Sequence, residues 1–93
     1  MIKSFRCKET EKIFNGKESR KFPPEIQRRV LNKLEMIKNA KTINDLRIPP
    51  SNHLEQLSGN RKGQWSIRVN DKYRICFEWK KNYGENIELT DYH

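Results

Sequence analysis

The sequence predicts one α+β domain spanning residues 1–93, a small antiparallel sheet with two to three helices packed on one of its faces. Three observations lead to this prediction. Apolar and polar residues alternate between positions 57 and 79, which indicates two antiparallel strands joined by a tight turn. Apolar residues between positions 26 and 37 recur at helical spacing. A chain of 93 residues also has room for only one hydrophobic core.

The predicted hairpin has one apolar and one polar face. Its turn falls at residues 70–72, Asn-Asp-Lys, which tolerate turn geometry. On the polar face Ser66, Arg68 and Arg74 lie side by side, because cross-strand neighbours are only about 5 Å apart. Two guanidinium groups on one sheet face need either acidic partners or a ligand phosphate. The residues of the apolar face are Trp65, Ile67, Val69, Tyr73, Ile75, Phe77 and Trp79.

The segment before the hairpin predicts a strand at residues 2–6 and a short helix at residues 10–14. This helix ends before Gly16, because glycine adopts the left-handed conformation without a steric penalty. A long helix begins near Pro24, since proline is favoured in the first turn of a helix. Its basic face is expected to be solvated, with a role in binding a partner as the alternative. That face consists of Arg28, Arg29, Lys33 and Lys38.

One more helical turn is expected at Thr42, where Asp45 takes the place of the Glu in a capping box, and Pro49 ends it. The remaining expected elements are a loop at residues 51–53, the start of a short strand at 54–57, a turn at 82–86 and a last strand at 87–91. Because the helices gather on one face of the sheet, the polar face is expected to be open. A basic, uncovered sheet face suits RNA.

The chain is strongly basic, with 20 Lys and Arg residues against 12 Asp and Glu and a net charge of +8. Such an excess favours a polyanionic partner such as nucleic acid. No long apolar run or signal peptide is present, so the protein is expected to be cytoplasmic and to contact no membrane. Cys7 and Cys76 are expected to be reduced thiols. No paired Cys or His spacing supports a metal site, and no cofactor is expected.

Three stretches of the chain, residues 59–70, 73–77 and 91–93, resemble those of the HigB-type toxins of the RelE superfamily, which belong to bacterial type II toxin–antitoxin systems. The resemblance covers essentially the whole chain and agrees with the small antiparallel sheet backed by helices. It implies a metal-independent endoribonuclease that cuts messenger RNA in the ribosomal A site. The residues that carry it are Gly59-Asn60-Arg61-x-Gly63-x-Trp65-Ser66-Ile67-Arg68-Val69-Asn70, Tyr73-Arg74-Ile75-x-Phe77 and the final Asp91-Tyr92-His93.

The reaction implied by the resemblance is attack of a ribose 2′-hydroxyl on the neighbouring phosphate. It requires a base, an acid and a cation on the developing phosphorane charge. Arg74 matches the family's strand arginine and is expected to stabilise that charge, because a guanidinium binds two oxygens at once. The alternative is a structural pair with Glu78 or Glu88. His93 matches the family's terminal histidine and is expected to act as the acid.

Asp91 and Tyr92 are expected to orient the acid and to stack or relay a proton. The chain departs from the family where relatives have a second histidine, because Glu55 stands there, and Ser58 stands in the place of a lysine. Either Glu55 or His53 is therefore the expected base. Other basic residues of the same region are expected to bind RNA. They are Arg61, Lys62 and Arg68.

The resemblance also implies the partners. These are the 70S ribosome with its messenger RNA and a HigA-type helix-turn-helix antitoxin, and operator DNA is reached only through the antitoxin complex. Two alternatives remain open from the residues. One is a non-enzymatic toxin like the ParE proteins of the same superfamily, and the other is a ribosome- or RNA-binding module without catalysis.

Overall fold

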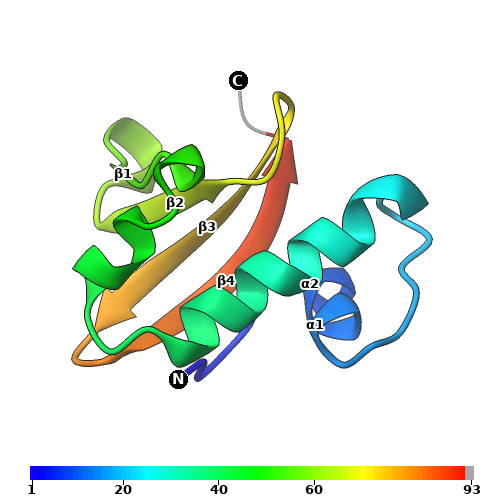
Figure 1. The fold of residues 1–93 in the computed structure, drawn as a ribbon, viewed down its shortest axis with the longest axis horizontal. Coiled ribbons are helices and arrows are strands. Elements are labelled where there is room, and N and C mark those ends of the chain that lie inside the picture. Colours follow the sequence, from blue (N-terminus) through cyan, green and yellow to red (C-terminus); the bar gives the residue numbers. More distant parts are fainter. Residues whose placement is uncertain (92–93) are drawn as a thin grey trace.

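The computed structural model describes residues 1–91, which form a four-stranded antiparallel sheet in the order β1-β2-β3-β4 with two α-helices (Figure 1). The predicted α+β fold is thereby confirmed. The strands are β1 Glu55–Gln56, β2 Gln64–Arg68, β3 Tyr73–Lys80 and β4 Tyr83–Asp91. The helices are α1 Lys8–Phe14 and α2 Pro24–Asn39, with short 3₁₀ helices η1 Ile43–Arg47, η2 Pro50–Asn52 and η3 Gly59–Arg61.

Helix α2 supplies the cover of the sheet and crosses one of its faces, with α1 beside it (Figure 1). It begins at Pro24 as predicted, and its apolar stripe is buried at Ile26, Val30, Leu34 and Ile37. Burying a side chain of this size contributes about 1.5–3 kcal/mol. No helix within residues 1–91 is long and apolar enough to cross a membrane.

The predicted hairpin is confirmed as β2 and β3. Ile67 pairs with Ile75 and Trp65 with Phe77, so the apolar residues of both strands face α2 together. Asn70 closes the turn, because its side-chain Oδ1 accepts hydrogen bonds from the backbone N–H groups of residues 72 and 73 at 2.9 and 2.7 Å. An asparagine that bonds to its own following backbone is a common way to fix a turn.

The predicted turn at residues 82–86 is wrong, because β4 already begins at Tyr83. Only Lys81 and Asn82 separate β3 from β4, and Lys81 adopts a positive φ of 55°. Asn86 also has a positive φ, 52°, at a β-bulge within β4, and its Nδ2 donates to Glu78 Oε2 at 2.8 Å. Asparagine is among the few residues that tolerate this conformation. Asn86, a residue type common in turns, therefore lies inside strand β4, which is why the sequence predicted a turn there.

The strand predicted at residues 2–6 is wrong as well. The segment makes only two isolated parallel bridges to β4, Ile2 with Gly84 and Phe5 with Ile87. Between them the bulge at Asn86 interrupts the ladder, and the Asn86 N–H is instead bonded to Ser4 Oγ at 2.9 Å.

The predictions for residues 10–14, 42–49 and 51–53 hold with one exception, whereas η3 was not predicted. Helix α1 ends at Phe14 before Gly16, whose φ is 82°, although it begins at Lys8 rather than at residue 10. In η1 the Asp45 carboxylate accepts the backbone N–H of Thr42 at 3.1 Å, as a capping residue should. The exception is the loop predicted at residues 51–53, because Asn52 lies fully buried at the end of η2.

Candidate active site

Arg74 lies on β3, on the sheet face that points away from α2, and only 12% of its side chain is exposed. Its Nε donates to Ser66 Oγ at 2.8 Å, and its Nη2 donates to the backbone oxygen of His53 at 2.5 Å. These bonds come from β2 and from the end of η2, so two separate elements hold the guanidinium. A charged group with such fixed donors is already oriented for an incoming phosphate oxygen.

Glu55 is the acidic neighbour of Arg74. Its Oε1 lies 3.7 Å from Arg74 Nη1, and β1 places it opposite Ser66. The alternative pairing of Arg74 with Glu78 or Glu88 is wrong, because Glu78 accepts from Asn86 and Glu88 accepts from Arg61. The strand pairing thus brings the expected cation and one expected base together. The Glu55 side chain remains 55% exposed, which leaves its carboxylate accessible to a substrate.

His53 reaches this site through its backbone. It has a left-handed conformation with φ 43°, and its carbonyl oxygen accepts the bond from Arg74. The residue itself is exposed. Glu55 therefore presents its carboxylate beside Arg74, whereas His53 contacts Arg74 through its main chain.

The polar sheet face is less open than the sequence predicts. Ser66 and Cys76 face each other across β2 and β3, and both are fully buried. Arg74 bonds to Ser66, while Arg61 Nη1 donates to Glu88 Oε1 at 2.8 Å above the neighbouring strand. Burial raises the pKa of the Cys76 thiol, which keeps it protonated at neutral pH. Charged side chains paired with each other thus cover most of this face.

The three residues expected to bind RNA lie in different settings. Arg61 is half-buried in η3, where it contacts Glu88 and Gln64, and Lys62 is exposed directly after η3. Arg68 pairs with Arg74 in the sheet register and bonds to Asp71 in the hairpin turn. Of the three residues, Arg68 is therefore the one that the strand pairing places opposite Arg74.

Asp91, the last described residue, pairs with Tyr73 in the register of β3 and β4, whereas Arg74 pairs with Thr90. Because residues directly opposite each other project from one face, Asp91 and Arg74 project from opposite faces. A hollow of about 370 Å³ at this edge is lined by residues of both faces, Asp91 and Thr90 among them. Lys72 Nζ lies 3.7 Å from Asp91 Oδ2. Tyr92 and His93 lie outside the described residues.

A family model described as a HigB-like toxin, the RelE-like toxin of the type II toxin–antitoxin system HigB, matches residues 3–93 of this chain. The chain belongs to this family. The resemblance stated from the sequence motifs is thereby confirmed.

Two curated relatives match the toxin over nearly their whole length. Toxin HigB-1 of Vibrio cholerae serotype O1 is 42% identical over 90 residues, with 96% of this chain and 95% of the relative covered. Endoribonuclease HigB of Proteus vulgaris is 31% identical over 93 residues, with 100% of both chains covered. Among solved structures, the YoeB-YefM complex from Staphylococcus aureus matches with a TM-score of 0.62 at 19% identity, covering 100% of this chain and 98% of that chain. This last likeness shows the fold alone.

Sequence reasoning about the toxin gave no role to two groups that position Arg74. They are the Ser66 hydroxyl and the His53 carbonyl, which accept the Nε and Nη2 bonds. The signal for Ser66 was present, because a serine diagonal to an arginine on one sheet face lies within reach of its guanidinium. The His53 carbonyl had no such signal, since a backbone contact depends on the path of η2 rather than on residue type.

Proposed function

We propose that this HigB-like toxin is a metal-independent endoribonuclease that cleaves messenger RNA in the ribosomal A site. The observation that carries the proposal is the pairing of Arg74 with Glu55 at 3.7 Å on one sheet face. A cation for the phosphate and a carboxylate for the attacking hydroxyl are thus adjacent. The near full-length relative from Proteus vulgaris, named an endoribonuclease, supports the same reaction.

In the proposed reaction the ribose 2′-oxygen attacks the adjacent phosphorus. A new bond joins the 2′-oxygen to phosphorus while the bond from phosphorus to the 5′-oxygen breaks. Glu55 accepts the proton of the 2′-hydroxyl, and His93 donates a proton to the leaving 5′-oxygen. The products are a 2′,3′-cyclic phosphate and a 5′-hydroxyl. Positioned acid and base groups of this kind contribute roughly 10²–10⁴-fold each to a rate.

Arg74 has donors left for the phosphate. An arginine carries five N–H donors, and the bonds to Ser66 and His53 use the Nε and Nη2 side of the group. Nη1 faces Glu55, so a phosphate oxygen approaching between the two side chains meets a guanidinium already held in place. Fixed donors of this kind lower the barrier because they need no reorganisation during the reaction.

The proposed dependence on the ribosome follows from how few groups this site offers. Glu55 is largely exposed, and Arg74 is the cation that contacts it. Such a site lacks the means to hold a flexible RNA strand in line for attack. The ribosome supplies that alignment in the A site, and correct orientation is worth roughly 7–11 kcal/mol.

The test is incubation of the purified toxin with 70S ribosomes and a defined message, followed by mapping of the cleaved ends. We expect discrete ends at the A-site codon and no efficient cutting of the same RNA without ribosomes. Efficient cutting of naked RNA at physiological salt contradicts the ribosome dependence. Absence of any cleaved end contradicts the nuclease and leaves a ParE-like or purely RNA-binding toxin.

The proposed partner is a HigA-type helix-turn-helix antitoxin, since the family is that of a type II toxin–antitoxin system. The toxin carries a net charge of +8, which favours an antitoxin segment of acidic character. Operator DNA is contacted through the antitoxin in this proposal. We expect a gene next to that of the toxin to encode a small helix-turn-helix protein, and co-expression with this protein should restore growth and yield a complex that co-purifies.

Replacing Glu55 by Gln should reduce cleavage on the ribosome by roughly 10²–10⁴-fold, because the amide keeps the shape of the side chain but accepts no proton. His53→Asn is the matched control, since asparagine tolerates the left-handed backbone of residue 53. Single-turnover rates at equal toxin concentration provide the comparison. If His53→Asn slows the reaction and Glu55→Gln leaves it unchanged, His53 is the base.

A further inference from the structure

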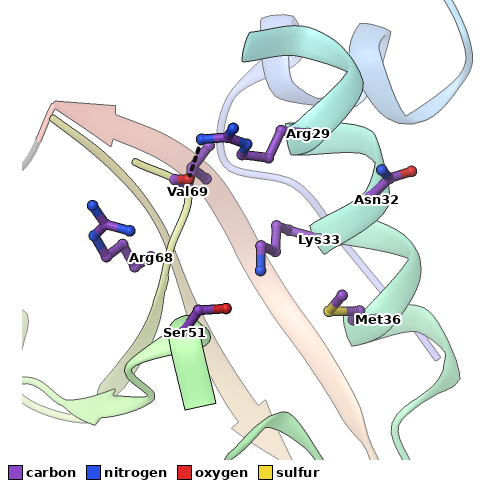
Figure 2. A pocket seen from close by; sticks show the side chains of 7 residues that line it. All are labelled: Arg29, Asn32, Lys33, Met36, Ser51, Arg68 and Val69. Carbon is purple, nitrogen blue, oxygen red and sulfur yellow. Dashed lines mark hydrogen bonds between the residues drawn. The ribbon is translucent and has the colours of Figure 1, made fainter. Parts of the chain in front are cut away.

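A basic pocket of about 330 Å³ lies between α2, η2 and the end of β2 (Figure 2). We call it the Lys33 pocket. Arg29 and Lys33 reach it from α2, Arg68 borders it from β2, and Met36 and Val69 are apolar lining residues. Ser51 and Asn32 add polar side chains, and among residues 1–91 no acidic side chain lines the pocket. The prediction that Arg29 and Lys33 belong to a solvated helix face is wrong for Lys33, which is only 8% exposed.

Lys33 is held in one orientation. Its Nζ donates to Asn52 Oδ1 at 2.5 Å, and Asn52 in turn donates through Nδ2 to the Leu46 backbone oxygen at 3.1 Å. The second bond fixes which end of the Asn52 amide faces Lys33. An ammonium group carries three N–H donors, so the bond to Asn52 leaves donors for a ligand. Figure 2 shows the Lys33 side chain extending from α2 toward Ser51.

The charge in the pocket is only partly compensated, because Arg68 alone of its three cations pairs with a carboxylate within residues 1–91. Burial lowers the pKa of Lys33, and the guanidinium groups of Arg29 and Arg68 lower it further. Arg68 bonds to Asp71 in the exposed turn, whereas Arg29 Nη1 donates to the Val69 backbone oxygen at 3.3 Å. Within residues 1–91 neither Lys33 nor Arg29 has an ion pair with a carboxylate. A buried cation without an anion is costly, so an anion entering here gains strongly.

We propose that the Lys33 pocket binds a backbone phosphate of the RNA substrate, next to the phosphate held by Arg74. The inference rests on the proposed nuclease function. The two sites are neighbours in the sheet, because Arg68, which lines the pocket, is the register partner of Arg74. Ser51 also lies two residues before His53, whose carbonyl holds Arg74. An RNA strand bound at Arg74 therefore meets a second cationic site on the same protein.

The observations favour RNA over an acidic protein segment. Arginine forks, a lysine and a serine hydroxyl are the usual donors to phosphate oxygens, and the apolar lining residues Met36 and Val69 give a ribose or base a surface to pack on. A carboxylate would use the same cations. A phosphate chain accounts better for a second cationic site that borders the register partner of Arg74, because successive phosphates of one RNA strand can occupy both sites.

The test is fluorescence anisotropy with a labelled 2′-O-methyl oligoribonucleotide, which the toxin cannot cleave, at several salt concentrations. Lys33→Met should weaken binding roughly tenfold and lower the salt slope by about 1, because one phosphate contact is lost. Lys38→Met is the matched control, since it removes the same charge from an exposed position of the same helix. It should change binding by less than about twofold.

Thermal melting of each variant separates binding from folding. Lys33→Met should melt near the temperature of the unaltered toxin, because it removes an unpaired buried cation but also leaves the buried Asn52 Oδ1 without its donor. Where it instead destabilises, Arg29→Met gives the same binding test from an exposed position. Equal effects of Lys33→Met, Arg29→Met and Lys38→Met on RNA binding overturn the proposal.

Competition identifies the source of the anion. Displacement of the oligonucleotide by an unlabelled strand, with little effect of millimolar inorganic phosphate, supports a backbone phosphate. Binding of inorganic phosphate that depends on Lys33, with RNA binding that does not, overturns the RNA assignment, as does tighter Lys33-dependent binding of a glutamate-rich peptide. A further outcome is a toxin that binds RNA through Lys33 and yet cleaves nothing on ribosomes. That result refutes the proposed nuclease activity, whereas the proposal that the Lys33 pocket binds RNA still holds.

Discussion

Arg74→Ala should reduce cleavage of a ribosome-bound message by roughly 10²–10³-fold, because it removes the fixed cation from the developing charge on the phosphate. The same change leaves Ser66 Oγ and the His53 carbonyl without their donor. An unsatisfied buried group costs about 1–3 kcal/mol, so a moderate loss of stability should accompany the loss of activity. Single-turnover cleavage and urea denaturation measure the two effects separately.

Two further variants make the Arg74 result specific. Arg74→Lys keeps the charge but loses the fork, so we expect it to recover only part of the activity. Arg47→Ala removes an arginine of η1 that bonds to Asn44 at the surface and should cleave like the unaltered toxin. If Arg74→Ala retains full cleavage at equal protein levels, Arg74 holds β1 and η2 in place and has no part in the chemistry.

Deleting Tyr92 and His93 should abolish toxicity, with a loss of cleavage of roughly 10²–10⁴-fold, because the expected general acid is removed. The described hydrophobic core ends at Leu89 in β4, so the deletion should leave the melting temperature nearly unchanged. His93→Gln is the narrower variant and should lose most of the same activity. Growth after induced expression, cleavage on ribosomes and thermal melting measure the three quantities.

Toxicity that survives both the deletion and Arg74→Ala places the active site elsewhere on the protein. A deletion that lowers the melting temperature by more than a few degrees shows instead that the last two residues support the fold. In that case His93→Gln alone decides whether an acid acts there.

The sequence predicted well those parts of the fold in which apolar residues recur at regular strand or helix spacing. The alternation through β2 and β3 and the helical stripe of α2 each survive in the structure, because one face of each element is buried in a single core. The failures lie where a side chain replaces regular pairing. Asn86 carries a positive φ within β4 and bonds to Glu78, so a residue typical of turns sits in a strand.

The candidate site shows the same division. The register of β2 and β3 follows from the hairpin pattern and was predictable, whereas the pairing of β1 with β2 across η3, which places Glu55 beside Arg74, was not. Asp91 lies two residues after Leu89 and four after Ile87, so strand alternation already placed it on the sheet face opposite to that of Arg74. Lys33 lies three residues after Val30 and four before Ile37, so helical spacing placed it beside the buried stripe. Because Lys33 is charged, it was nevertheless expected on the solvated face of the helix.

The contact of Arg74 with the His53 carbonyl was beyond prediction, because it depends on how η2 packs against β2. The burial of Asn52, which fixes Lys33, depends likewise on how η2 packs against α2 and η1. Tertiary contacts between short segments of this kind leave no periodic signal in the sequence.

The most direct test of the proposed chemistry uses two messages on 70S ribosomes that differ by one oxygen atom. One is all RNA, and the other carries a single 2′-deoxy nucleotide on the 5′ side of the mapped cleavage position. Attack by the 2′-hydroxyl predicts cleavage of the first message to a 2′,3′-cyclic phosphate and a 5′-hydroxyl, and no cleavage of the second. Equal cleavage of both messages contradicts this account.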